Sequence, residues 1–168
     1  NVCDILAAAF LAQLWQFILL VLLLGSSAFF SGSETAFFHL SRRQVRRFSK
    51  STLRLERLIA LILADPNRFL TALLLGNMAV NVLYFAVSSV LALQIGQAYG
   101  TAWGTLVAVV SFLALLMGGE MLPKSVAYSN TKRFCMIASP ACYLLLRGLA
   151  PVLKAMDVVI VQPALRLF

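Results

Sequence analysis

Residues 68–93 read RFLTALLLGNMAVNVLYFAVSSVLAL, and this stretch decides the fold. After Arg68 it carries no charged side chain. As a helix it would be roughly 39 Å long, which is enough to cross the ~30 Å hydrocarbon core of a bilayer. Residues 5–30 and 101–122 are similarly apolar, and the 168-residue chain is 61% hydrophobic and 12% charged. Its mean hydropathy of +0.91 excludes an ordinary soluble domain. The sequence predicts an all-α membrane protein with three transmembrane helices, at residues 5–30, 68–93 and 101–122.

The basic residues predict the orientation. The net charge is +8, and the basic residues gather in the connection between the first two spans, whereas the next connection has none. We therefore predict that residues 35–64 form amphipathic juxtamembrane helices on the cytoplasmic side. The amino terminus would then lie outside and the carboxyl terminus in the cytoplasm. The first of these helices, expected at residues 35–50, carries five basic residues on one face: Arg42, Arg43, Arg46, Arg47 and Lys50. Since aromatic stacking platforms are missing, we expect no nucleic acid partner.

Prolines interrupt the carboxyl-terminal part of the chain. Pro123 is expected to end the third span, and Pro140 and Pro151 break the apolar stretch that follows. We therefore predict a proline-bent interfacial or re-entrant helix at about residues 134–160 and favour three spans, although a fourth would fit the length.

Each apolar span carries a cluster of oxygen donors. Ser31 and Ser33 close the first, Asn77 and Asn81 lie one helical turn apart in the second, and Glu120 ends the third. Hydroxyl, amide and carboxylate oxygens are hard ligands that suit Mg²⁺. Polar groups at membrane depth are costly and mark functional sites. Together the clusters predict one cation site, reached from the cytoplasmic side.

Each cluster also has a plainer interpretation. The two asparagines could simply hydrogen-bond a neighbouring helix. The Ser31-x-x-Glu34 pattern matches a capping box for a following helix. Glu120 could pair with Lys124 one turn further on.

Three motifs resemble one known family. Phe30-Ser31-Gly32, Gly76-Asn77-x-x-Val80-Asn81 and Gly119-Glu120-x-x-Pro123-Lys124 resemble the cyclin M / CorC family of magnesium transporters. The resemblance implies a single transmembrane domain over residues 1–168, with the cytosolic regulatory domains of that family absent. It also implies a homodimer in a bacterial-type plasma membrane that exports Mg²⁺ by sodium antiport, with Na⁺ as the coupling ion. The implied metal ligands are Ser31 or Ser33, Asn77, Asn81, Glu120 and a backbone carbonyl near Gly118 or Gly119.

Other functions use the same residues differently. A Mg²⁺-sensing membrane scaffold that regulates other transporters would need the same ligands. A protein that perturbs membranes would use the basic helix but leave the oxygen clusters without a role. We expect no enzyme, because the sequence shows no Ser/His/Asp, Cys/His or paired-carboxylate arrangement.

Overall fold

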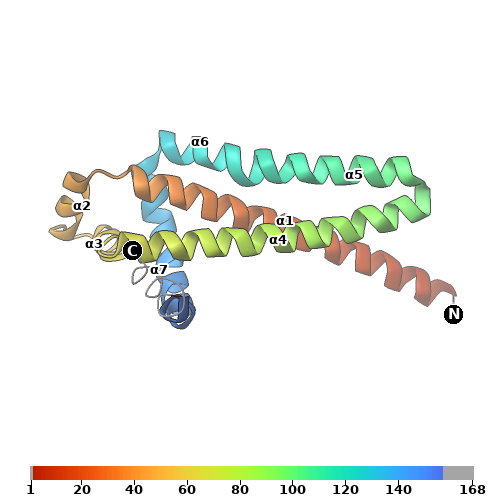
Figure 1. The fold of residues 1–168 in the computed structure, drawn as a ribbon, viewed down its shortest axis with the longest axis horizontal. Coiled ribbons are helices and arrows are strands. Elements are labelled where there is room, and N and C mark those ends of the chain that lie inside the picture. The colour runs from red at the N-terminus through yellow and green to blue at the C-terminus, as the bar shows by residue number, and fades with distance from the viewer. Residues whose placement is uncertain (1, 157–168) are drawn as a thin grey trace, which may run out of the picture. The chain divides into compact units, whose positions relative to one another are not determined.

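The computed structural model describes the backbone of residues 2–156 and the side chains of residues 14–151. Every element in this range is helical, as predicted (Figure 1). The elements are α1 (Val2–His39), α2 (Arg42–Ser49), α3 (Arg54–Ile62), α4 (Pro66–Tyr99), α5 (Thr101–Ala114), the π-helix η1 (Leu115–Met121), α6 (Leu122–Ser129) and α7 (Thr131–Met156).

These elements form two compact units. Unit 1 contains Asn1–Ser31 and Asn77–Ser125, and unit 2 contains Gly32–Gly76 and Val126–Phe168. Helices α1, α4 and α6 each contribute residues to both units. The candidate site lies in unit 1, and the basic juxtamembrane helices lie in unit 2.

Four helical stretches in the described residues are long and apolar enough to cross a membrane, which corrects the prediction of three. They are Leu14–His39, Pro66–Tyr99, Thr101–Ser129 and Thr131–Pro151. In the most apolar 18 residues of each stretch, at most 22% of the residues are buried. Most of their side chains are therefore available to lipid. The fourth stretch is α7, which continues through Pro140. Both prolines that were predicted to break this stretch, Pro140 and Pro151, lie inside α7 without ending it. Residues 157–160 of the predicted bent helix lie outside the described residues.

The ends of the first span differ from the prediction. Ser31 and Glu34 lie inside α1, so they form no capping box. The helix ends at His39, and the capping box belongs instead to Ser41 and Gln44 at the start of α2. Both pairs have the same spacing, and only the second follows a break in the helix. The first juxtamembrane helix therefore begins at Arg42 rather than at Thr35.

The second and third spans are also longer than predicted. Helix α4 begins at Pro66, two residues before the predicted start, and runs to Tyr99. Gly100 alone makes the turn into α5, with a φ of 103° that favours glycine. Pro123 is the second residue of α6 and does not end the third span. The wider turns of η1 precede it and accommodate a residue that lacks an N–H group.

Unit 1 is held by an apolar cluster between α1, α4 and η1. Leu20, Tyr84 and Leu115 are buried at its centre. The hydroxyl of Tyr84 donates to the carbonyl oxygen of Ser111 at 3.1 Å, which satisfies this buried phenol. This cluster lies next to the polar residues of the candidate site along each helix.

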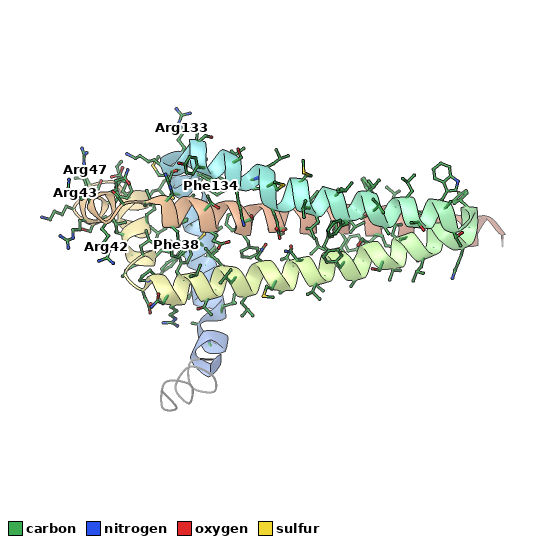
Figure 2. The ribbon with its side chains drawn as sticks, turned by 45° about the horizontal axis from the view of Figure 1, so that its top comes forward. Phe38, Arg42, Arg43, Arg47, Arg133 and Phe134 are labelled. Atoms are coloured by element: carbon green, nitrogen blue, oxygen red, sulfur yellow. The ribbon has the colours of Figure 1, made fainter. Side chains whose placement is uncertain are left out.

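In unit 2, helix α3 packs against both α2 and α7. The predicted basic residues of α2 are exposed, and Figure 2 shows Arg42, Arg43 and Arg47 extending from this helix. Phe37 and Phe69 are buried where α1 ends and α4 begins, with ring centroids 4.9 Å apart.

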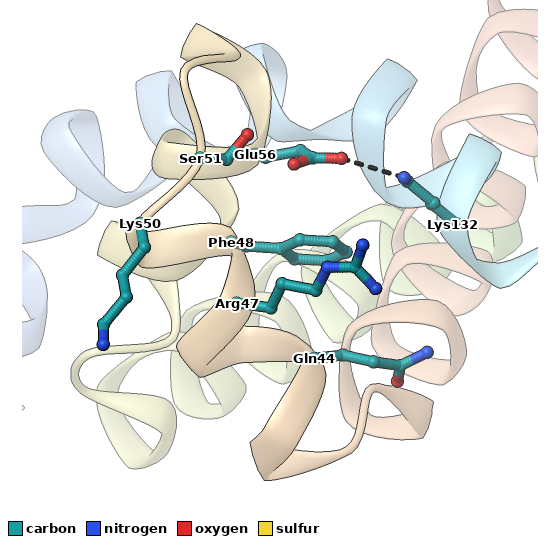
Figure 3. Close-up of a pocket in the computed structure, with 7 residues that line it drawn as sticks. All are labelled: Gln44, Arg47, Phe48, Lys50, Ser51, Glu56 and Lys132. Atoms are coloured by element: carbon teal, nitrogen blue, oxygen red, sulfur yellow. Dashed lines mark ion pairs between the residues drawn. The ribbon is translucent and has the colours of Figure 1, made fainter.

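An ion pair joins α3 to α7. The Nζ of Lys132 lies 2.8 Å from Oε1 of Glu56, whose side chain is only 9% exposed (Figure 3). The same ammonium lies 5.5 Å from the ring centroid of Phe48 on α2. The hydrogen bonds that Glu56 accepts from Lys132 and Ser51 hold the pKa of this carboxyl below its ordinary 4.5, against the opposing effect of burial.

This pKa shift predicts an acid-sensitive unit 2. Because the pKa of Glu56 is lower in the folded state, the ion pair stabilises the fold above pH 4.5, and this contribution disappears as the pH falls through the folded pKa. We expect the melting temperature of the wild-type protein in detergent to fall between pH 6 and pH 3 more steeply than that of Glu56→Gln. Parallel melting curves for the two proteins would contradict this prediction.

Candidate metal centre

A network of hydrogen bonds links three helices of unit 1. Ser27 Oγ of α1 lies 2.7 Å from Asn81 Oδ1 and 3.4 Å from Asn77 Oδ1, both on α4. Asn81 Nδ2 donates to Glu120 Oε1 at 3.2 Å, which extends the network to η1. The Ser27 hydroxyl has one proton, so it donates to only one amide oxygen at a time. The other oxygen stays available to a cation.

Ser31 adds a second connection between α1 and η1. Its Oγ donates to the backbone carbonyl oxygen of Glu120 at 3.3 Å. Glu120 therefore presents both a carboxylate and a main-chain oxygen to the cluster. Four predicted ligands meet in unit 1: Ser31, Asn77, Asn81 and Glu120.

The π-helix η1 determines how Glu120 enters the cluster. In this segment the backbone bonds reach five residues back, as in the bond from the Leu122 N–H group to the Met117 carbonyl. Such turns are rare and occur frequently at functional sites, because they rotate the following residues relative to an α-helix. Glu120 is the sixth residue of the seven in η1.

Gly119 allows α1 to approach η1 closely. A Cβ atom at Gly119 would lie 3.0 Å from Ser27 Oγ and 3.1 Å from Leu115 Cδ1. Both neighbours are buried, so neither moves freely. At Gly118 a Cβ would meet only Leu24, at 3.7 Å or more, which is ordinary contact. Gly119 thus contributes to the contact between α1 and η1 by its lack of a side chain, and its carbonyl as a metal ligand stays a prediction.

Ser33, the alternative serine ligand, points elsewhere on α1. Two residues correspond to about 200° of rotation, so Ser31 and Ser33 face opposite sides of the helix. Ser33 belongs to unit 2, where its hydroxyl is buried and makes no hydrogen bond to any described residue. The geometry favours Ser31 as the serine of the cluster.

Ser27 was not identified from the sequence, although it is fully buried and central to the network. It lies four residues before Ser31, hence on the same face of α1. A second hydroxyl at this spacing in an apolar run was the available signal. Among the described residues, the neighbouring Ser26 hydroxyl bonds the Leu22 carbonyl of its own helix at 2.8 Å and no other group.

The chemistry of this cluster is that of a hard, weakly charged cation site. The donors are hydroxyl, amide, carbonyl and one carboxylate, so the site would carry a single formal negative charge. Among the described side chains, no three His, Cys, Asp or Glu residues gather in a way that would hold a metal. The set therefore fits Mg²⁺ or Na⁺ better than Zn²⁺. Asn77, Asn81 and Glu120 are only partly buried, so an ion could reach their oxygens.

Apolar helices with exposed surfaces and a polar cluster define an integral membrane domain. The comparison with known families agrees, since residues 18–167 match the cyclin M transmembrane N-terminal domain. The chain belongs to this family.

Three similar proteins place the chain among longer relatives. The UPF0053 inner membrane protein YfjD of Escherichia coli is 31% identical over 119 residues, which cover 71% of this chain and 26% of that protein. A UPF0053 protein of Haemophilus influenzae is 27% identical over 142 residues, which cover 84% of this chain and 33% of that protein. A chloroplastic DUF21 domain-containing protein of Arabidopsis thaliana is 32% identical over 130 residues, which cover 77% of this chain and 19% of that protein. The chain thus spans a third or less of each of these relatives.

The two adjacent glycines provide a test of the close contact. Gly119→Ala should lower the free energy of unfolding by about 1–3 kcal/mol, because the added methyl group overpacks Ser27 and Leu115. Gly118→Ala should be neutral or slightly stabilising, since alanine favours a helix and its methyl group has room. Reversible unfolding in mixed micelles measures both. Equal effects of the two substitutions would contradict the assigned contact.

Proposed function

We propose that this domain transports Mg²⁺ across the membrane and that the Na⁺ gradient drives its export. The observation that carries the proposal is the convergence of Ser27, Asn81 and Glu120 from three helices, joined by hydrogen bonds of 2.7 Å and 3.2 Å. Membership of the cyclin M family supports a membrane role. Sodium coupling, the direction of transport and a homodimeric state rest on the resemblance of the sequence motifs.

Mg²⁺ is the substrate, and the side chains must replace part of its hydration shell. Mg²⁺ requires near-octahedral oxygen coordination and loses water reluctantly. The amide oxygens of Asn77 and Asn81, the Glu120 carboxylate and the Ser31 hydroxyl would supply this coordination. An amide oxygen has two lone pairs and a carboxylate has about four acceptor sites, so Asn81 and Glu120 could coordinate an ion while the bonds from Ser27 and from Asn81 Nδ2 remain.

The low charge of the site suits transport rather than storage. One carboxylate against a divalent ion leaves a net positive charge in an apolar region, which limits affinity. Limited affinity favours release on the far side of the membrane. The unusual backbone of η1 provides a second element that could differ between ion-bound and ion-free states.

We also propose the orientation given by the positive charges. The α2–α3 connection would face the cytoplasm, and the turn at Gly100 would face outside. The cluster would then be loaded from the cytoplasmic side, and the protein would lie in a bacterial-type plasma membrane.

Flux through proteoliposomes tests the transport proposal. Vesicles containing the wild-type domain should release entrapped Mg²⁺ when a Na⁺ gradient is imposed, as measured with a Mg²⁺-sensitive dye. Glu120→Gln should reduce the initial rate by at least about tenfold, because it removes the only charged ligand, an interaction worth roughly 1.5–3 kcal/mol. Mg²⁺ binding without flux under any Na⁺ gradient would contradict transport and favour the sensing scaffold.

The paired serines provide a matched control for the same assay. Ser27→Ala should reduce flux several-fold, since the Ser27 hydroxyl holds the amide oxygen of Asn81 through a hydrogen bond of 2.7 Å. Ser26→Ala should leave flux unchanged, because its hydroxyl donates to the Leu22 carbonyl of its own helix and lies outside the polar cluster. Similar rates for Ser27→Ala and the wild-type protein would exclude Ser27 from the site.

A further inference from the structure

A groove in unit 2 lies where α1 ends and α4 begins. It has a volume of about 430 Å³. Its apolar lining includes Phe38, Leu40, Val45 and Leu63, and the two charged lining residues are Arg42 and Arg46 of α2. A groove lined by apolar side chains and two arginines offers contacts to both parts of a phospholipid, the fatty chain and the charged headgroup.

The arginines face the groove as a pair. Arg42 and Arg46 are one helical turn apart, so their side chains lie on one face of α2. Both are exposed, and no acidic residue lines the groove. Asp65 lies just before the lining residue Pro66, but its Oδ1 accepts a hydrogen bond from the Arg68 backbone at 3.2 Å. The lining of the groove itself therefore carries two positive charges and no negative one.

The groove lies at the level where a membrane surface would be. The apolar stretch of α1 ends at His39, and that of α4 begins at Pro66. Phe38 is 43% exposed at this boundary, and its ring stacks on Phe69 with centroids 6.3 Å apart. Aromatic and basic side chains at the end of a span typically contact lipid headgroups.

A second basic cavity in unit 2 fits an anion less well. It is lined by Arg47, Lys50, Lys132 and the buried Glu56. Glu56 already pairs with Lys132, and Lys50 extends away from Lys132 (Figure 3). A negative headgroup there would meet the Glu56 carboxylate. The charge arrangement favours the groove at Arg42 and Arg46.

We propose that this groove binds one anionic phospholipid. The phosphate group lies between the guanidinium groups of Arg42 and Arg46, which form strong charge-assisted bonds with phosphate oxygens. One fatty chain lies along Phe38, Val45 and Leu63. This differs from the general attraction of a basic segment to an anionic surface, which depends on the number of charges rather than on their positions. It is also independent of Mg²⁺ transport.

Two double variants with the same loss of charge test the proposal. Arg42→Gln/Arg46→Gln removes the pair at the groove, and Arg43→Gln/Arg47→Gln removes the neighbouring pair at the same spacing on α2. Native mass spectrometry of the detergent-solubilised protein, titrated with phosphatidylglycerol, measures the fraction that carries one lipid. We expect the first variant to need at least tenfold more lipid for half-occupancy, and the second to stay within twofold of the wild-type protein.

Several results would overturn the proposal. If both double variants lost phosphatidylglycerol binding equally, the attraction would be non-specific. If the wild-type protein retained phosphatidylcholine as well as phosphatidylglycerol, the headgroup charge would be irrelevant. Displacement of the lipid by inorganic phosphate at similar concentrations would identify a free-anion site. Phe38→Ala should also weaken retention several-fold, and no effect would remove the fatty chain from the groove. Unchanged melting temperatures of the arginine variants, whose side chains are exposed, would confirm that they fold.

Discussion

The bond between Asn81 and Glu120 is the interaction on which the arrangement of unit 1 depends. A carboxylate and two amides in apolar helices are costly unless they find polar partners. Asn81 meets this requirement for two helices at once, accepting from Ser27 at 2.7 Å and donating to Glu120 at 3.2 Å. Gly119 favours the close approach that this requires, because a Cβ atom there would lie 3.0 Å from Ser27 Oγ. The close packing at Gly119 and the hydrogen bonds of the polar side chains therefore require the same alignment of α1, α4 and η1.

The same network explains why the proposed site has so little charge. Its neutral oxygens are held by one another when no ion is bound, which avoids the cost of leaving them unpaired in an apolar region. In a site built from several carboxylates, the negative charges would repel one another when no ion is bound. Hydroxyl and amide groups can exchange a hydrogen bond for a metal ligand with little change in structure. This property is useful in a protein that must bind and release the same ion repeatedly.

Much of this arrangement could be predicted from the sequence, and the failures share a physical cause. The apolar runs predicted the helices, and the spacing of Asn77 and Asn81 placed both on one face of α4. Local signals at Ser31, Pro123 and Pro140 were misleading. The capping pattern at Ser31 does not end α1, and neither Pro123 in α6 nor Pro140 in α7 ends its helix. Ser27 was missed because a single buried serine looks like any other small residue until its partners across the helices are known.

Locating the ion itself is the most direct test of the central claim. Mn²⁺ favours the same hard oxygen ligands as Mg²⁺ and can be located by its anomalous scattering in a crystal. A crystal structure of the domain grown with Mn²⁺ should show one anomalous peak in unit 1, roughly 2 Å from oxygens of Asn77, Asn81 and Glu120. A peak that avoids these three residues, with the bond between Asn81 and Glu120 intact, would contradict the account.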